Sequence, residues 1–387
     1  MEPQSPLDAA RKLAPQIRSA AEEIEAAREL PRPLFEAIAD AGMFHLLVPR
    51  AIGGGELDLP TYIQVIEELG KADASTAWAV NQGAVFATYA ARMPRDRARA
   101  IWIDPPRAVV ANSPAPTATA VVVPGGYRVT GRQGFSTGCR HATWVGAHCT
   151  TVLENGQKRI DTNGQPEARY CFVPVTEAEL LDTWQVRGMR GTGTHHFAVN
   201  DVFVPEERSL LSVTAPVLEP GPLYRIPRTL EFASGDASVS IGMARACLDA
   251  FSELAGAKTP RAMPGLLREQ ALVQADVGHA EANVRAAKAL LTETVRDVWA
   301  DVASGVPLTL DRRATLRIAT THAIRLCVSV IDTLYNADGA TSVYESHVIQ
   351  RYFQDIHVIS QHMQSRLAHY ELVGRHWLGL PVDEARL

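Results

Sequence analysis

The sequence has 387 residues, of which 46% are hydrophobic and 21% are charged, and its formal net charge is −5. This length predicts two or three structural units, and this composition is typical of folded globular proteins, which excludes disorder over most of the chain. The sequence has no block rich in Lys and Arg, which argues against a nucleic-acid partner, and no apolar run of about 18 residues, which argues against a membrane span.

The first unit, residues 1–107, is predicted to be helical. Apolar residues recur there every three or four positions, and Pro31 and Pro33 interrupt the first helical stretch. The pair Pro105-Pro106 closes the unit. The predicted helices cover residues 7–30, 34–44, 62–69 and 76–92.

In the second unit, residues 108–215, the apolar period changes to two, which is typical of β-strands. Asn155-Gly156 and Asn163-Gly164 are hairpin-type turns. Short strands at this spacing predict a small β-barrel or sandwich. The predicted strands cover residues 127–130, 144–152, 170–175 and 196–204.

The third unit, residues 228–387, follows an ordered linker that holds four prolines within residues 215–228. Its long amphipathic stretches with short connections predict an antiparallel four-helix bundle. The overall prediction is an α+β fold with a helical, then β, then helical-bundle order. The predicted bundle helices cover residues 233–254, 266–300, 312–337 and 346–378.

The five cysteines are scattered, and none is spaced as CxxC. The first residues, Met1–Pro6, lack the apolar core of a secretory signal. We therefore expect reduced thiols and a cytoplasmic protein. The adjacent His195 and His196 lie on a predicted strand, so their side chains point to opposite faces, and no metal site is expected.

Two glycine-rich clusters could form phosphate-binding loops, namely residues 53–55 and 188–193. Neither fits GxGxxG between a strand and a helix, so the fingerprint of a nicotinamide site is absent. The second cluster carries Arg187, Arg190, Thr192 and Thr194 as donors, and it suits either an anion, a planar polar ring or a solvated turn.

Two histidines lie on the last predicted helix. His357 and His362 are five residues apart, which turns them about 140° from each other. His362 is predicted to share a polar face that either lines a site or is solvated. That face carries Arg351, Asp355, Val358 and Arg366. The hydroxyls of Ser136 and Thr137, after the strand at 127–132, either bind a ligand heteroatom or close a turn.

Taken together, segments through nearly the whole chain resemble the acyl-CoA dehydrogenase fold superfamily, and more closely its two-component, reduced-flavin-dependent (group D) monooxygenase branch. The most specific match is Trp184–Thr194 with Val202–Glu206. The other matching segments are Pro33–Pro60, Ser75–Trp78, Gly125–Arg132, Phe135–Gly138 and Gln350–Arg375.

The resemblance also separates two chemistries. Many of the dehydrogenases carry a glutamate base shortly after an Arg-Asp pair, although some members place it on another helix. In this sequence the pair is Gln354-Asp355. The residue eight positions after Asp355, where the glutamate base is expected, is Met363, so no carboxylate occupies the position of the base. The segment that helps bind the FAD diphosphate is not seen where the chain has Lys258–Arg261, which favours FMN, with FAD possible. An acyl-CoA dehydrogenase or oxidase using FAD is the alternative.

The monooxygenase branch implies that a separate NAD(P)H:flavin reductase delivers reduced FMN, which forms a C4a-hydroperoxide with O2 and oxygenates an aromatic or N/S-containing small molecule. It implies a homotetramer with no nucleic-acid or membrane partner. Gln133 replaces a usual aromatic residue, and residues 82–86 lack a usual histidine, so the substrate need not be the phenol or steroid-like ring of familiar relatives. The resemblance implies catalytic roles for His362, Ser136 and Thr137; cofactor contacts from Ser113, Phe135, Ser136, Thr137, Trp184, Arg190, Gly191 and Thr192; and substrate contacts from Trp78, Asn81, His357 and His362.

Overall fold

A computed structural model describes residues 5–114, 117–261 and 263–387; the start of the N-terminal segment, residues 1–4, lies outside the described residues. The first part is helical, as predicted. Ser5 caps the first helix by accepting from the backbone of Asp8, and Asp58 and Asp73 cap the fourth and fifth helices in the same way. The helices are α1 (Pro6–Ser19), α2 (Ala21–Ala27), α3 (Arg32–Asp40), α4 (Leu59–Ala72), α5 (Ala74–Phe86) and α6 (Arg95–Trp102).

The middle part is a mixed sheet, whose described strands follow the order β7-β8-β3-β2-β4-β6-β9, with β1 and β5 pairing with β4. The predicted hairpin at Asn155-Gly156 is confirmed, because both residues have positive φ and connect β4 to β5. The strands are β1 (Val110–Asn112), β2 (Ala118–Val123), β3 (Gly126–Ser136), β4 (Trp144–Glu154), β5 (Gln157–Lys158), β6 (Arg169–Pro174), β7 (Glu179–Leu181), β8 (His195–Pro205) and β9 (Ser209–Leu211).

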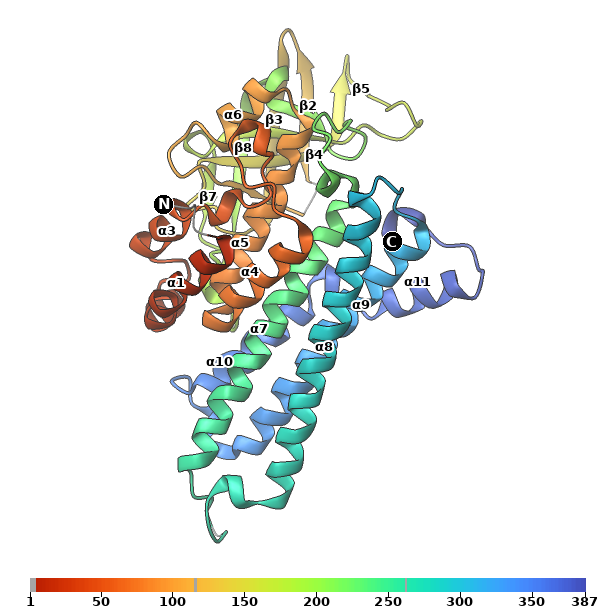
Figure 1. The fold of residues 1–387 in the computed structure, drawn as a ribbon. Helices are drawn as coiled ribbons and strands as arrows, with labels where there is room; N and C mark the ends of the chain where they lie inside the picture. Colours follow the sequence, from red (N-terminus) through yellow and green to blue (C-terminus); the bar gives the residue numbers. More distant parts are fainter. Residues whose placement is uncertain (1–4, 115–116, 262) are drawn as a thin grey trace.

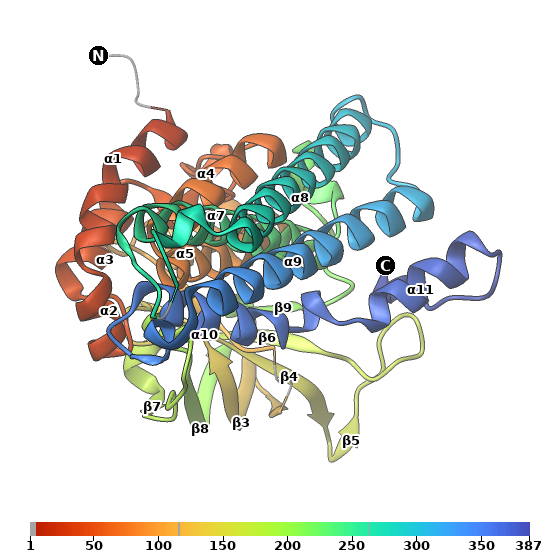
Figure 2. The same ribbon diagram turned by 90° about the horizontal axis from the view of Figure 1, so that it is seen from below.

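The last part is a bundle of four helices followed by a short fifth helix. The helices are α7 (Arg228–Ala257), α8 (Ala271–Ala303), α9 (Leu310–Asp338), α10 (Val348–Ser360) and α11 (Ala368–Trp377). The predicted α+β order is confirmed. Figure 2 shows the strands gathered below the helices, while α7 runs between the N-terminal helices and the rest of the bundle. In Figure 1, α11 projects from the side of the molecule.

The continuous last helix predicted over 346–378 is wrong, because the helix breaks after Ser360 and resumes at Ala368. Arg325 of α9 donates to the carbonyls of Ser360 and Ser365, which no longer have helical partners. His362 therefore lies in extended backbone beyond the helix end, not on a face shared with Arg351 or Asp355.

One described stretch, Leu310–Val343, is long and apolar enough to cross a membrane by length and composition alone, contrary to the expectation from the sequence. In this fold 61% of its most apolar window is buried. The stretch contains α9, which packs against α7, α8 and α10, and the central helix of a bundle meets the same criterion.

Candidate functional site

His362 forms a close pair with a carboxylate on α7. Its Nδ1 lies 3.0 Å from Oδ2 of Asp236, whose side chain is completely buried, while the His362 side chain is 26% exposed. The ring of Trp78 meets the His362 ring edge-on, with 5.0 Å between their centroids. The carboxylate favours the tautomer with the proton on Nδ1, so Nε2 is left to accept a proton from a ligand. The contact between His362 and Asp236 is a close ion pair and not a well-aligned hydrogen bond, because Nδ1 of His362 and Oδ2 of Asp236 both lack a hydrogen-bond partner among the described residues.

Two amides of α5 hold the Asp236 carboxylate in place. Asn81 donates from Nδ2 to Oδ1 of Asp236 at 2.9 Å, and Gln82 donates to the same oxygen at 3.3 Å. The hydroxyl of Tyr62 in turn donates to Oδ1 of Asn81 at 2.6 Å. Gly235 is required for this approach, because a Cβ there would lie 1.8 Å from Oδ1 of Asn81. The pair is therefore fixed by a hydrogen-bonded network.

The electrostatics of the pair are set by burial. Loss of solvent raises the pKa of Asp236, and His362, Asn81 and Arg317 oppose this shift. Arg317 of α9 is buried, and its pKa falls to about 10 because of that burial. Its guanidinium donates to the side chain of Gln364, two residues after His362. The network thus joins α5, α7, α9 and the break after α10.

An exposed aromatic surface lies at the end of β3. The ring of Phe135 is 58% exposed, and Trp184 stands edge-on to it at 6.3 Å between centroids. Phe135 has a φ of 59°, a strained value for a bulky residue. Trp184 is fixed because its Nε1 donates to the carbonyl of Met189 at 3.0 Å. An exposed ring beside a second one suits a planar aromatic ligand such as a flavin, so these residues fit the cofactor that the resemblance implies.

The two hydroxyls after Phe135 differ in their partners. Ser136 is buried, and its Oγ has no hydrogen-bond partner among the described residues. The hydroxyl of Thr137 lies 3.0 Å from that of Thr194, which lies 2.7 Å from that of Thr192. Ser136 thus has an unused hydroxyl, whereas Thr137 begins a chain of threonine hydroxyls.

The glycine-rich loop 188–194 is packed tightly against helices. A Cβ on Gly191 would lie 2.0 Å from Cγ2 of Ile24. The Arg190 guanidinium donates to the carbonyl of Glu25 at 3.1 Å and to that of Val186 at 3.3 Å. Both residues thus fasten the loop to α2, and the predicted contact of Arg190 and Gly191 with a cofactor stays a prediction.

The remaining predicted residues lie in different places. Ser113 donates to the carbonyl of Gly134, so it lies beside the Phe135 turn. His357 lies on α10, and its Nε2 is 2.9 Å from Oδ1 of Asp332 on α9. The structure brings Trp78, Asn81 and His362 together, and it gives His357 a separate carboxylate partner.

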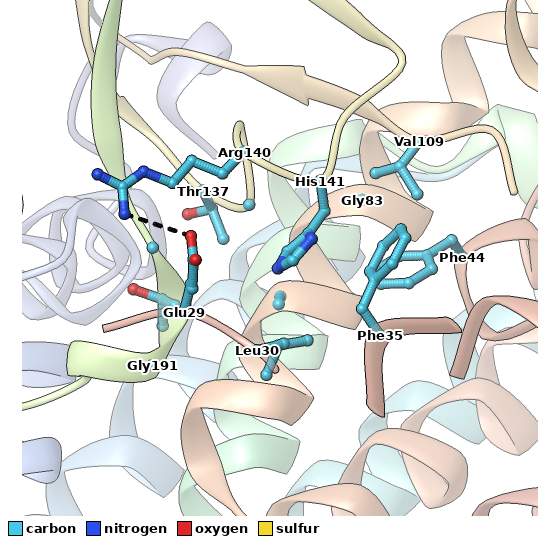
Figure 3. A pocket seen from close by; sticks show the side chains of 14 residues that line it. Glu29, Leu30, Phe35, Phe44, Gly83, Val109, Thr137, Arg140, His141 and Gly191 are labelled. Atoms are coloured by element: carbon cyan, nitrogen blue, oxygen red, sulfur yellow. Dashed lines mark hydrogen bonds and ion pairs between the residues drawn. The ribbon is translucent and has the colours of Figure 1, made fainter. Parts of the chain in front are cut away.

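Figure 3 shows a small cavity beside Thr137 that is also lined by Phe35 and His141. It has a volume of about 20 Å³, which is room for about one water molecule and too little for a flavin. Within it, His141 stacks on Phe35 at 4.5 Å, and Arg140 lies 3.4 Å from Glu29. These four residues were not predicted from the sequence, whereas Thr137, Gly191 and Thr192, which also line the cavity, were. At this volume the cavity is a gap in packing between α3, α5 and the sheet.

A larger surface depression of about 340 Å³ lies by the N-terminus of α4, lined by residues that include Arg50, Glu56, Asp58 and Trp299. Its two carboxylates are already used, since Glu56 accepts from the backbone of Arg50 and Asp58 caps α4. None of the residues predicted as a site lines it. No group of three His, Cys, Asp or Glu side chains among the described residues is arranged to hold a metal ion.

Sequence reasoning missed Asp236, Gln82 and Arg317. Asp236 is 126 residues before His362, so no spacing motif connects them. One local feature could have identified Asp236. A single aspartate among the small and apolar residues of a long predicted helix is expected to be buried, and a buried carboxylate needs a charged or hydrogen-bonding partner.

The comparisons with known proteins agree with this architecture. Residues 4–105 match the model of the acyl-CoA dehydrogenase N-terminal domain, and residues 234–366 match that of the C-terminal domain. The chain is 30% identical to the indole-3-acetate monooxygenase of Pseudomonas putida over 92% of this chain and 89% of that protein.

Two further relatives are linked to flavin, one by its name and one by the ligand in its solved structure. The flavin-dependent monooxygenase oxygenase subunit HsaA of Mycobacterium tuberculosis is 30% identical over 98% of this chain and 96% of that protein. Its crystal structure matches with a TM-score of 0.88, covering 99% of each chain. XiaF from a Streptomyces species, solved in complex with FADH2 and glycerol, matches with a TM-score of 0.86 at 26% identity, covering 97% of this chain and 95% of that chain. The chain therefore belongs to the flavin-dependent monooxygenase branch of the acyl-CoA dehydrogenase family.

Proposed function

We propose that this protein is the oxygenase component of a two-component monooxygenase, which takes reduced FMN from a separate reductase and oxygenates an aromatic or N/S-containing small molecule. The observation that carries this proposal is the His362–Asp236 pair beside Trp78, because the carboxylate favours a proton on Nδ1 and leaves Nε2 to accept one from a ligand. Relatives named for indole-3-acetate and p-hydroxyphenylacetate support an aromatic substrate.

In this proposal, bound reduced flavin supplies the activation of O2 and the transfer of one oxygen atom. Phe135 and Trp184 hold the isoalloxazine ring, and Ser136 or Thr137 donates a hydrogen bond to it. His362 takes a proton through Nε2 from an acidic O–H or N–H of the substrate, because Asp236 stabilises the resulting imidazolium. The buried network of Asn81, Gln82 and Arg317 keeps the histidine in one orientation.

FMN is proposed as the flavin rather than FAD. Lys258, in the segment where many relatives bind the FAD diphosphate, has its Nζ 2.7 Å from Oδ1 of Asp338 and 2.7 Å from the hydroxyl of Thr341. An ammonium group that is already paired with a carboxylate of its own subunit is a poor partner for the diphosphate of FAD. FADH2 is the competing cofactor, as in the XiaF complex.

The alternative of thioester dehydrogenation needs a free carboxylate base. Asp236 is the carboxylate nearest to His362, and it already faces that histidine and two amide donors. Because its oxygens are already directed at these partners, this carboxylate is poorly placed to remove a carbon-bound proton from a substrate.

We also propose a homotetramer in the cytoplasm. Large apolar side chains are exposed near the projecting α11, including Leu367, Trp377 and Leu378, and burial against another subunit would remove them from water. The cysteines are free and buried, as in a reducing compartment. Sedimentation equilibrium measures the stoichiometry, and cell fractionation measures the location.

The test of function supplies the flavin-free protein with FMN, a flavin reductase, NADH and a panel of aromatic compounds. We expect O2 consumption to depend on reduced FMN, with an oxygenated product found by mass spectrometry. His362→Ala should continue to consume O2 but release it as H2O2, with product per O2 reduced about 100-fold, the scale of lost general base catalysis.

Two outcomes would overturn the proposal. One is a protein that binds oxidised FAD tightly and is bleached by an acyl-CoA, which is the behaviour of a dehydrogenase. The other is a protein that binds neither reduced FMN nor reduced FAD. Unchanged coupling in His362→Ala would remove only the assigned role of that residue.

A further inference from the structure

The segment that carries Trp184 runs between β7 and the glycine-rich loop without regular secondary structure. Residues 182–186 follow the end of β7 at Leu181, so their backbone groups belong to no strand or helix. Backbone N–H and C=O groups that leave water need hydrogen-bond partners, and in such a segment other parts of the fold supply them. The orientation of the Trp184 ring therefore depends on those partners.

His195, the first residue of β8, accepts hydrogen bonds from this segment. The backbone N–H groups of Thr183 and Trp184 both donate to its Nδ1, each at 3.2 Å. His195 also lies opposite Ser136 in the pairing of β3 with β8, so it stands beside the strand end that carries Phe135. One ring nitrogen thus connects the backbone of Trp184 to the strands that present the other ring of the exposed aromatic surface.

The two donors determine the protonation of this imidazole. A ring nitrogen that accepts two hydrogen bonds carries no proton, so neutral His195 has its proton on Nε2. Its side chain is 1% exposed. This burial, with the positive charge of Arg140, lowers the pKa of His195 from its ordinary value. Asp182 and Glu29 oppose the shift, and Arg28 adds to it. His195 is therefore neutral at pH 7, and its Nδ1 remains an acceptor.

Arg28, which follows α2, holds the Trp184 backbone from the other side. Its Nη1 donates to the carbonyl of Trp184 at 3.2 Å. The same guanidinium makes a two-point contact with the Asp182 carboxylate, at 2.8 and 2.9 Å, which fixes its own position. Since the indole nitrogen of Trp184 donates to the carbonyl of Met189, both the backbone and the ring of Trp184 are held.

The other ring nitrogen of His195 gives no reason for a histidine at this position. Nε2 is buried and has no hydrogen-bond partner among the described residues. A buried N–H without a partner is unfavourable, and an apolar residue of similar size would avoid that cost. The acceptor at Nδ1 is therefore what distinguishes a histidine from an apolar residue here.

We propose that His195 is a positioning residue that orients Trp184 for flavin binding, while Arg28 holds the same residue from α2. This inference rests on the proposed function, in which Phe135 and Trp184 hold the isoalloxazine ring. An aromatic side chain whose backbone and ring are already fixed loses little freedom when a planar ligand stacks on it, so more of the contact energy appears as affinity. His195 acts through Trp184 and does not itself touch the flavin.

The first measurement uses the flavin-free protein. Acrylamide quenching of tryptophan fluorescence, taken as the difference between each protein and the same protein carrying Trp184→Phe, reports the exposure of the Trp184 ring. We expect His195→Leu to raise the quenching constant of Trp184, because two backbone N–H groups lose their acceptor. His195→Asn should stay near the wild type, because its Oδ1 takes the place of Nδ1 as acceptor.

The second measurement is the dissociation constant of FMN, oxidised and reduced, by anaerobic calorimetry. His195→Leu should weaken binding about tenfold, the scale of one or two lost hydrogen bonds, and His195→Asn should restore most of it. In a Trp184→Phe background the effect of His195→Leu on affinity should disappear, because His195 acts only through Trp184. A merely structural histidine would cost the same affinity in both backgrounds.

His148→Leu is the matched control and should change neither measurement. His148 is a half-buried histidine of β4 in the same sheet, and neither of its ring nitrogens has a partner among the described residues. Circular dichroism melting shows whether His195→Leu is folded. If it is not, acid replaces it, because protonation of Nδ1 removes the acceptor. Quenching of Trp184 in the wild type should then rise as the pH falls below 6.5, the ordinary pKa of histidine, while His195→Asn stays constant.

Three outcomes would overturn the inference. They are unchanged quenching or unchanged FMN affinity in His195→Leu, equal losses in folded His195→Asn and His195→Leu, and a loss that persists in the Trp184→Phe background. If His195→Leu is unfolded, equal acid responses of the wild type and His195→Asn would overturn it as well. The quenching is read without flavin. A protein that binds no flavin would therefore overturn the proposed function, whereas altered quenching with unchanged FMN affinity would overturn only this inference.

Discussion

At the scale of single residues, the site depends on two side chains from distant parts of the sequence, since Nδ1 of His362 lies 3.0 Å from Oδ2 of Asp236. His362 was found because the resemblance pointed to it, whereas Asp236 belongs to a different helix and to no motif. Trp78 and Asn81 were found in the same way, and both contact this pair directly. The hydrogen bonds between these side chains depend on how α5, α7 and the chain after α10 pack together. The spacing of residues within one segment does not predict that packing.

The first prediction concerns Asp236→Asn, which keeps the shape of the side chain and removes its charge. We expect kcat to fall about 10- to 100-fold with little change in KM, because Asp236 orients His362 and does not touch the substrate. Product per O2 should fall as well, while H2O2 release rises.

The matched control is Asp332→Asn, because Asp332 forms an equivalent pair with His357 at 2.9 Å on the outer side of the bundle. This variant should leave kcat, KM and coupling unchanged. If both variants lose activity equally, or if Asp236→Asn alters only melting temperature, Asp236 is structural and the assigned role is wrong.

At the scale of elements, periodicity located the long helices and strands but not the break between α10 and α11. Residues 361–367 include no proline or glycine, so the local sequence contains no helix-breaking residue that would predict the end of the helix. The cause is distant, since Arg325 of α9 binds the carbonyls that a continuous helix would have used. Tertiary contacts thus override a helical pattern and turn His362 toward α7.

The second prediction is that Arg325→Met destabilises the protein and disturbs the site together. Loss of charge-assisted bonds to the Ser360 and Ser365 carbonyls should cost about 2–4 kcal/mol of unfolding free energy. Product per O2 should also fall, because His362 is no longer held. Urea denaturation and the coupling assay measure the two effects. Arg366→Met, at an exposed arginine in the same break, should change neither, and equal losses in both variants would refute the mechanism.

At the scale of the whole molecule, the glycine-rich loop joins the three parts of the fold. The backbone N–H of Met189 donates to Asp355 of α10, and a Cβ on Gly188 would lie 2.2 Å from the carbonyl of Gln354. Across the loop, Gly191 packs on Ile24 of α2. The sequence indicated that this loop could bind a ligand. Its close contacts also make it a junction between the three parts of the fold, and the sequence alone does not predict contacts between those parts.

The third prediction concerns the charge at this junction. Burial and Asp73 raise the pKa of Glu25 to about 7, while Arg351 and Arg190 oppose the shift, and Asp355 is the other buried carboxyl facing the group. The folded protein therefore holds the Glu25 proton more tightly than the unfolded chain, so this stabilisation is complete below about pH 4.5 and is lost as the pH rises through 7.

Glu25→Gln cannot ionise, so its advantage over the wild type should grow between pH 5 and 8, by up to about 3 kcal/mol of unfolding free energy. Urea denaturation at several pH values measures this difference. Glu22→Gln, on the exposed face of the same short helix, should track the wild type at every pH. A Glu25→Gln curve parallel to the wild-type curve would mean that Glu25 is ionised at the junction and that the two arginines outweigh its burial. Ion pairs, and not a protonated Glu25, would then hold the three parts together.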